Sequence, residues 1–203
     1  MGEETIVDYR TTTKALWKEF HVHQHDNLPF ECWWNVTREN LYDFFGKMGF
    51  KVGAEIGVRM GTNAKEMFNR IPGLKLYCVD PWEAYQRVTD SAQITYYDRC
   101  VRKLIGCDAV LMKNFSVPAS KEFADESLDF VYVDGDHRAD YVFEDILHWT
   151  PKVKKGGIIS GHDYFAFYQS GVILAVDSYC FANNIKQFYT TREKAPSWFF
   201  CKE

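Results

Sequence analysis

Short apolar runs alternate with amphipathic segments along most of the chain. The runs are rich in small and β-branched residues, which predicts strands covered on both faces. The segments between them repeat apolar residues at i, i+3, i+4 and i+7, which predicts helices. The predicted strands are residues 52–58, 74–79, 109–112, 128–133, 158–161, 186–191 and 197–201. The predicted helices are residues 15–20, 37–49, 62–71, 91–105, 116–124, 139–150 and 172–182.

This order of elements predicts an α/β fold. Strands that alternate with helices form a mostly parallel sheet with helices on both faces, so we expect a Rossmann-like, doubly wound sheet of seven strands. A short loop joins the last two strands, so we expect them to pair as a C-terminal antiparallel hairpin. A chain of 203 residues fits one domain. We expect residues 38–203 to form its main part and residues 1–37 an N-terminal extension that caps the substrate.

Two predicted helices show which of their sides we expect to be buried. The predicted buried face of residues 91–105 is Ile94, Tyr97, Val101, Leu104 and Ile105. The predicted buried stripe of residues 139–150 is Ala139, Val142, Phe143, Ile146, Leu147 and Thr150. The acids Asp140, Glu144 and Asp145 fall outside that stripe, so the pattern places them away from the core.

A glycine-containing turn follows the first strand of the alternating region. Gly57 and Gly61 allow positive φ and let a ligand approach the backbone. Thr62 or Asn63 is placed to cap the next helix, and the free amides of the turn form a polar cradle. Glu55 is an acid within an otherwise apolar strand, which is unfavourable unless the carboxylate has a partner or a function. The stretch therefore predicts either an ordinary strand–helix turn or a ligand site.

Composition and charge exclude several classes of protein. The net charge is −4 without a dense Lys/Arg run, which argues against nucleic acid as the main partner, although not against a local basic patch. No apolar run is long enough to cross a membrane, and the first residues lack the apolar region of a signal peptide. None of the six cysteines forms a C-x-x-C pair, so we expect free thiols and a cytoplasmic location.

Polar residues recur where the predicted strands end. Asp80 ends the second strand of the alternating region, residues 134–137 follow the fourth, and His162 and Asp163 follow the fifth. The carboxyl ends of parallel strands form one edge of a sheet, where ligands bind. An acid at Asp80 can accept both hydroxyls of a ribose, whereas the chain lacks the G-x-G-x-x-G spacing that admits a pyrophosphate. An adenosine cofactor without phosphates fits best, and S-adenosylmethionine is the obvious candidate.

Four stretches, taken together, resemble the class I S-adenosylmethionine-dependent methyltransferases. They are Ala-Glu-Ile-Gly-Val at 54–58, Val-Asp-Pro-Trp at 79–82, Phe-Val-Tyr-Val-Asp-Gly-Asp-His at 130–137 and Gly-Gly-Ile-Ile-Ser-Gly-His-Asp-Tyr at 156–164. The resemblance covers residues 38–203 and is greatest to the small-molecule O-methyltransferases that include the macrocin and sugar enzymes. It implies methyl transfer to a small-molecule hydroxyl of sugar or natural-product type.

The resemblance also implies roles for matching positions. The implied cofactor-binding residues are Glu55, Gly57, Gly61, Asp80, Trp82, Asn114, Ser116 and Asp134. Glu55 and Gly57 would hold the methionine end of the cofactor. Asp80 would bind the ribose, with Trp82 packed against it. Asn114 and Ser116 would lie beside the adenine.

Catalysis is expected from the residues after the fourth and fifth strands. Relatives often bind a divalent metal with an acid and an acidic pair there, whereas this chain has His162 and Asp163 as the pair. Asp134, His162 and Asp163 could still hold magnesium or manganese, or a softer metal, and whether a metal is required stays open. Removal of the hydroxyl proton needs a base or a metal, and the expected catalytic residues are Asp134, His162 and His137. Asp136 either caps the next helix or takes part in catalysis.

Other interpretations stay open. A hydroxylase-like relative would hold a redox metal at the same residues, and a cofactor-binding protein would lack turnover. We expect a small-molecule substrate as partner, without nucleic acid or membrane, and leave homo-oligomer formation open. Acceptor specificity is expected from the N-terminal segment with Trp33 and Trp34 and from residues 83–90 with Tyr85, while residues 164–168 could add another wall. The alternating His21, His23 and His25 form either a metal site or a solvated segment.

Overall fold

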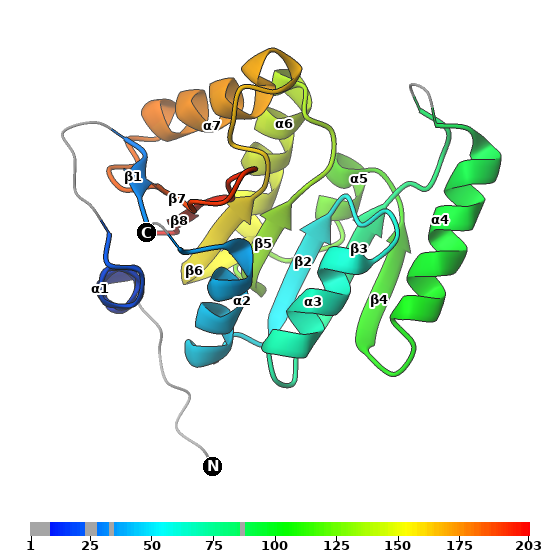
Figure 1. Cartoon of the computed structure of the whole chain (residues 1–203), viewed down its shortest axis with the longest axis horizontal. Helices are drawn as coiled ribbons and strands as arrows, with labels where there is room; N and C mark the ends of the chain where they lie inside the picture. The colour runs from blue at the N-terminus through cyan, green and yellow to red at the C-terminus, as the bar shows by residue number, and fades with distance from the viewer. Residues whose placement is uncertain (1–8, 23–27, 33–34, 86–87) are drawn as a thin grey trace.

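A central sheet with strand order β1-β7-β8-β6-β5-β2-β3-β4 organises the chain (Figure 1). The computed structural model describes residues 9–22, 28–32, 35–85 and 88–203. The strands are β1 (Phe30–Glu31), β2 (Val52–Ile56), β3 (Lys75–Asp80), β4 (Asp108–Lys113), β5 (Leu128–Val133), β6 (Val153–Gly161), β7 (Tyr189–Thr190) and β8 (Trp198–Cys201). β8 is antiparallel to its neighbours β6 and β7, and the other neighbouring pairs are parallel.

The predicted fold class is therefore confirmed, with a difference in strand number. The sheet has eight strands instead of seven, because β1 pairs with β7 at the edge. A strand of two residues is too short to show an alternating pattern, so β1 could not be predicted from periodicity.

Helices cover both faces of the sheet, as a doubly wound fold requires. They are α1 (Tyr9–Phe20), α2 (Arg38–Lys47), α3 (Thr62–Arg70), α4 (Asp90–Lys103), α5 (Ser116–Ser120), α6 (Ala139–Trp149) and α7 (Gly171–Ala182), with 3₁₀ turns η1 (Thr150–Lys152) and η2 (Tyr168–Ser170). Successive side chains of a strand point to opposite faces. Phe130 and Tyr132 of β5 pack with residues of α1 to α4, whereas Val131 and Val133 pack with residues of α5 to α7.

The described part of the N-terminal segment belongs to the hydrophobic core. Helix α1 is longer than the predicted 15–20, and its Leu16 and Phe20 are buried beside β6 and β8. The hydroxyl of Thr12 donates to the backbone oxygen of Gly156 at 2.7 Å. The expected role of residues 1–37 as a substrate cap stays a prediction, since Trp33, Trp34, His23 and His25 lie outside the described residues.

The predicted buried face of α4 is confirmed only in part: Leu104 is buried and Tyr97 packs against the core. Ile94 and Val101 are exposed, while Gln93 and Cys100 point inward. The helix also ends at Lys103, which leaves Ile105 outside it and 74% exposed. Helix α4 lies at the edge of the molecule beside α3, so only a narrow strip of it meets the core (Figure 1).

The buried stripe of α6 is rotated from the prediction. The residues it buries are Val142, Asp145, Ile146 and Trp149. Leu147 is exposed, and Asp145, expected outside the stripe, is only 5% exposed. The predicted stripe was drawn from the spacing of apolar residues. Helix α6 also buries an acid, Asp145, whose carboxylate has Ser116 on α5 as a hydrogen-bond donor.

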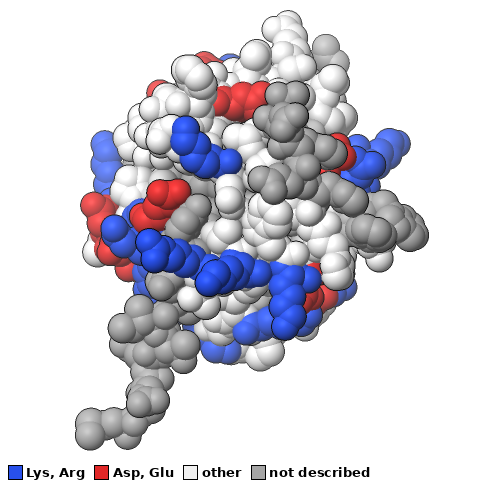
Figure 2. Space-filling model, turned by 90° about the vertical axis from the view of Figure 1, so that its left-hand side faces the viewer, with Lys and Arg blue, Asp and Glu red and all other residues white. Residues whose placement is uncertain are grey.

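A band of Lys and Arg side chains crosses one side of the molecule (Figure 2). This side carries α1, whose exposed residues include Arg10, Lys14 and Lys18 at helical spacing of four. Residues four apart share one helix face, so their charges add locally. The net charge of −4 therefore conceals a basic surface, which the absence of a dense run in the sequence did not exclude.

Two expectations from composition can be compared with the structure. Among the described residues, no helix combines the length and apolar character needed to cross a membrane. All six cysteines are free thiols, as expected, and Cys107 alone of them is not fully buried. The cytoplasmic location stays a prediction.

Leu16→Ala tests whether α1 is part of the folded domain. The side chain is fully buried, so its truncation should lower the free energy of unfolding by about 2–5 kcal/mol. Lys14→Ala, at an exposed position of the same helix, should change it by less than about 0.5 kcal/mol. Urea denaturation measures both variants. Equal, small effects would show that α1 is an appendage that does not support the core.

Candidate active site

The site lies where the strand order reverses, between β2 and β5. From β2 the chain continues to β3 and β4 on one side, while β5 and β6 lie on the other. In a doubly wound sheet this switch point opens a crevice at the carboxyl ends of the strands. A cavity of about 1260 Å³ occupies that place. Its wall includes these predicted residues: Glu55, Gly57, Asp80, Asn114, Ser116, Asp134, His137 and Asp163.

Glu55 brings a buried carboxylate to this cavity. It is 1% exposed, and its Oε1 accepts a hydrogen bond from Asn63 Nδ2 at 3.0 Å. Its Oε2 finds no hydrogen-bond partner among the residues that the structure describes. Burial raises the pKa of Glu55 to about 8, and the negative charges of Asp134 and Asp80 act in the same direction. The carboxylate is therefore poised to receive a cationic group.

Asn63 does not cap the following helix as predicted. Gly61, with φ 67°, is the N-cap of α3, and that cap has no side-chain hydrogen bond. The side chain of Asn63 turns back to Glu55 and also accepts from the hydroxyl of Tyr42 at 2.7 Å. Capping is a local preference, and here a buried carboxylate competes for the same amide.

The ends of β2 and β5 approach each other at Gly57. This residue has φ 91°, and a β-carbon there would lie 2.2 Å from the backbone oxygen of Asp134. The backbone bond from Asp134 N to Ile56 O at 2.7 Å holds this approach, while Gly57 N donates to Val79 O of β3 at 2.9 Å. Only glycine fits both the left-handed backbone and the space.

Asp80 fixes the loop that follows the glycine turn. Its Oδ2 accepts from Arg59 N and its Oδ1 from Trp82 N, both at 2.8 Å. Burial raises the pKa of Asp80, and these backbone donors oppose the rise. Trp82 is 3% exposed, donates from Nε1 to Arg59 O, and packs edge-on against Tyr97. Trp82 is thus a core residue beside the cavity and does not line its wall.

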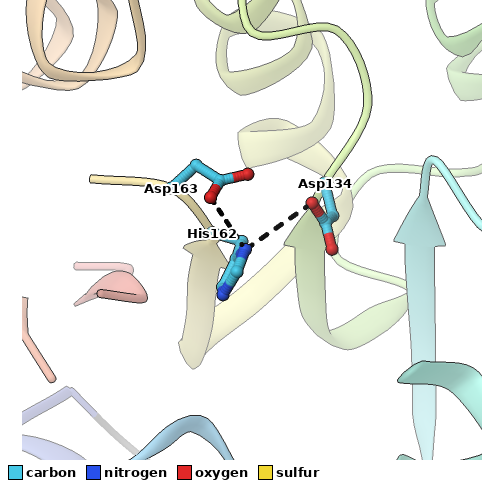
Figure 3. Close-up of side chains that lie close together, drawn as sticks. All are labelled: Asp134, His162 and Asp163. Carbon is cyan, nitrogen blue, oxygen red and sulfur yellow. Dashed lines mark ion pairs between the residues drawn. The ribbon is translucent and has the colours of Figure 1, made fainter. Parts of the chain in front are cut away.

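A second cluster follows β5 and β6 (Figure 3). His162 Nδ1 lies 3.3 Å from Asp163 Oδ1 and 3.9 Å from Asp134 Oδ1. His137 Nε2 lies 2.7 Å from Asp163 Oδ2, so Asp163 stands between two imidazoles. Each of Asp134, His162 and Asp163 offers a ligand atom within 4.8 Å of the others, which is a geometry that could hold a metal ion.

The charges of this cluster are strongly coupled. Burial raises the pKa of Asp134 to about 6, against the effect of His162. Burial also acts on Asp163, but hydrogen bonds from His137 and His162 hold its pKa well below the usual range. The pKa of His137 is raised by its hydrogen bond to Asp163, and that of His162 is raised by Asp163 and Asp134 despite burial.

The structure separates the predicted site residues into those on the cavity wall and those behind it. Three of the predicted site residues do not line the cavity: Gly61, Trp82 and His162. Gly61 packs against α4, where a β-carbon would lie 2.9 Å from Cys100 Sγ. Asp136 is on the wall. Its carboxylate accepts hydrogen bonds from the backbone N–H and the guanidinium of Arg138, and α6 has no side-chain cap.

Sequence reasoning missed several charged residues of the wall, and two of them, Arg38 and Asp145, come from helices. Arg38, at the start of α2, faces the acids, and its charge lowers the pKa of both Glu55 and Asp134. Asp145 reaches the wall from α6. No sequence signal marked Arg38, while the spacing of Asp145 with Val142, Ile146 and Trp149 would have placed it on a buried stripe.

Comparison by sequence finds a known domain family. A family model described as a methyltransferase domain matches residues 54–164, which is more than half of the chain. The matched region begins in β2 and ends just after β6, so it contains Glu55, Asp80, Asp134 and Asp163. No curated protein is similar enough in sequence to count as a match.

Solved structures share the fold at low sequence identity. A protein from Clostridium thermocellum provisionally named an rRNA methylase is 14% identical, with a TM-score of 0.58 over 83% of this chain and 98% of that one. Precorrin 8w decarboxylase from Methanobacterium thermoautotrophicum is 14% identical, with a TM-score of 0.57 over 82% and 89%. Precorrin-6y C5,15-methyltransferase from Geobacter metallireducens is 10% identical, with a TM-score of 0.52 over 98% and 90%. Such identities show the fold alone, and a fold does not fix a reaction.

Gly57→Ala should destabilise the protein more than Gly49→Ala does. Both glycines have positive φ, 91° and 76°, so both variants incur left-handed strain of about 1–2 kcal/mol. A β-carbon at Gly57 would also meet the Asp134 backbone, whereas none of the described atoms lies within 4 Å of one at Gly49. The added overpacking should lower the free energy of unfolding by about 1–3 kcal/mol more, measured in urea. Equal losses would contradict the close approach of the two strands.

Proposed function

This chain belongs to the methyltransferase domain family, and on that premise we propose that it transfers the methyl group of S-adenosylmethionine to a hydroxyl of a small molecule. The observation that carries the proposal is the buried carboxylate of Glu55, whose Oε2 finds no partner among the described residues. A buried acid of this kind is stable only with a donor or a cation beside it. The ammonium group at the methionine end of the cofactor supplies both.

Other residues of the wall fit the remaining parts of the cofactor. Gly57 leaves the backbone open to close approach. A carboxylate has about four acceptor positions, so Asp80 keeps acceptor capacity for the ribose after it has accepted from the backbone of Arg59 and Trp82. Asn114 and Ser116 lie on the wall after β4, where the adenine is expected. The residues present therefore fit the cofactor along its length.

The protein's part in the reaction is to orient the acceptor and to take its proton. When bound, S-adenosylmethionine supplies an electrophilic methyl group. Asp134 lines the cavity whereas His162 does not. We therefore propose that the Asp134 carboxylate takes the proton from the hydroxyl of the methyl acceptor. His162, 3.9 Å from Asp134 Oδ1, stabilises its negative charge. His137 also lines the cavity and is a second candidate base, held by Asp163.

We further propose that a divalent metal assists this step. Asp134, His162 and Asp163 provide two carboxylates and one imidazole, which suits magnesium or manganese and also accepts a softer ion. A metal held there would lower the pKa of the acceptor hydroxyl, and because Asp134 and His162 would then be ligands, His137 on the cavity wall would take the proton. The same three residues support the second candidate function, a hydroxylase-like activity with a redox metal, and bound iron without methyl transfer would favour it.

The cavity has room for an acceptor beside the cofactor. Its volume of about 1260 Å³ exceeds the roughly 300–1,000 Å³ of a typical small-ligand site. Tyr85, Tyr96 and Tyr141 contribute aromatic rings to its wall, which suits a sugar or a planar ring. We therefore propose a small-molecule acceptor, of sugar or natural-product type, in the reducing cytoplasm where free thiols persist.

S-adenosylhomocysteine, the cofactor without its methyl group, should bind the purified protein with micromolar Kd in calorimetric titration. Asp80→Asn should weaken that binding at least about tenfold, because a charged acceptor for the ribose hydroxyls becomes neutral. Asp98→Asn, an exposed change on α4 outside the cavity, should leave the Kd unchanged. If the native protein does not bind, or if Asp80→Asn binds equally well, the proposed cofactor site is wrong.

Manganese should bind the protein at one site, measured by the loss of its free electron paramagnetic resonance signal. Asp163→Asn should weaken this binding by about tenfold or more, since it removes a charged ligand. Asparagine tolerates the φ of 61° at this position, so the backbone should be preserved. Asp140→Asn, exposed at the start of α6, is the control. Unchanged manganese binding in Asp163→Asn would refute the metal site.

A further inference from the structure

Helix α4 carries a stripe of apolar side chains that the rest of the described chain leaves open to solvent. Ile94 is 60% exposed, Val101 is 39% exposed, and Ile105, in the turn after the helix, is 74% exposed. With Asp98 among them, these positions are spaced four, three and four residues apart. Residues at this spacing line one side of a helix, as they do where two helices pack along each other. The stripe therefore has the pattern of a helix–helix contact.

The stripe lies at the outer edge of the molecule. Ile94 and Val101 each follow a buried residue, Gln93 and Cys100, and consecutive residues are about 100° apart around a helix. The stripe thus faces sideways from the face that packs on the core. Helix α4 stands at the end of the sheet where β4 is the last strand (Figure 1). None of the described backbone hydrogen bonds joins β4 to an element other than β3, so no further strand covers this edge.

Two exposed charges belong to the same side of the helix. Asp98 lies within the stripe, and Arg102 lies one turn further along, at its border. The ion pairs and hydrogen bonds between described residues include neither side chain. An acid and a base inside an apolar stripe disfavour contact with a lipid bilayer, whereas a protein surface with complementary charges suits them.

A second copy of α4 that runs in the opposite direction has this complementarity. If Ile94 of one copy is level with Ile105 of the other, Asp98 is level with Val101 and reaches Arg102 of the other copy. A two-fold axis repeats each contact, so the pair gains two apolar contacts between isoleucines and two ion pairs. A parallel pair would instead place Asp98 against Asp98. The charges therefore favour the antiparallel arrangement.

We propose that α4 forms the interface of a two-fold symmetric homodimer in which the two helices pack antiparallel. Each helix keeps its core face on the same side of the pair, so the two sheets lie edge to edge with their β4 strands facing each other. The residues that α4 contributes to the cavity wall, Gln93 and Tyr96, are on other sides of the helix, so the dimer leaves the cavity open. The proposal is independent of the reaction that the cavity performs.

The size of this interface predicts a weak dimer. One helix of 14 residues from each copy forms the contact, which places the buried area below the roughly 1,200 Å² of a stable interface. We therefore expect a dissociation constant of about 10–100 μM.

Sedimentation velocity of the native protein from about 5 to 500 μM tests the dimer. The weight-average sedimentation coefficient should rise with concentration from the value of a monomer to that of a dimer. Val101→Asp removes an apolar contact and places a second acid beside Asp98 of the other copy, so association should weaken at least about tenfold. Leu174→Asp is the matched control, because it makes the same type of change at a 55% exposed position of α7. It should associate as the native protein does.

An exchange of charges tests the antiparallel alignment. Asp98→Arg sets two cations against each other and Arg102→Asp sets two acids against each other. Each change acts twice in the dimer, so each variant should associate at least about tenfold more weakly. The variant with both changes restores opposite charges and should return to within about threefold of the native association. Recovery is specific to contact between two copies, because a different partner would keep its original charges.

Three outcomes would overturn the proposal. A native protein that stays monomeric up to about 500 μM would show that the stripe serves a different protein or a membrane surface. Native association in Val101→Asp would show that the dimer uses another surface. Failure of the combined charge variant to recover, with its urea denaturation unchanged, would refute the antiparallel alignment. Binding of S-adenosylhomocysteine is measured separately on the same variants, and its presence or absence decides only the proposed function.

Discussion

The contact between the ends of β2 and β5 is the constraint on which the site depends. At Gly57 the chain turns away from β2 so close to Asp134 that a single added carbon would overlap its backbone oxygen. This contact brings the turn before α3 and the loop before α6 together as opposite sides of one cavity. It also places Glu55 and Asp134 near enough that the charge of Asp134 raises the pKa of Glu55. The same approach thus sets both the shape and the electrostatics of the site.

The cavity is lined by acids whose charges the protein leaves partly uncompensated. Burial raises the pKa of Glu55, Asp134 and Asp145, and Arg38 offsets the charge of the first two only in part. Asp163 differs, because two imidazoles hold it ionised. Buried charges without partners reduce stability, and such groups cluster where a ligand supplies the missing interaction. On this view the acidic wall is complementary to a ligand that carries an ammonium group.

The sequence was informative where a residue's role depends on its neighbours along the chain. Apolar runs located the strands, and the acids and histidines at their ends pointed to one edge of the sheet, where Asp134, His162 and Asp163 do meet. It failed where a residue's role depends on a distant partner. Asn63 resembled a helix cap but donates to Glu55, and Asp145, expected outside the buried stripe, is buried on α6. The edge strand β1 exists only through its pairing with β7.

Taken by itself, the sequence determined the α/β order, the parallel core of the sheet and the chemical types gathered at its carboxyl edge. These follow from periodicity and from strand direction, which are local properties of the chain. The tertiary structure decided which of those groups face the cavity, which stand behind it, and that Arg38 and Asp145 join them. Such choices depend on the rotation of each helix against the sheet and on hydrogen bonds between residues far apart in sequence. No pattern along a single chain encodes those distances, because they arise only when the two layers of helices are packed against the same sheet.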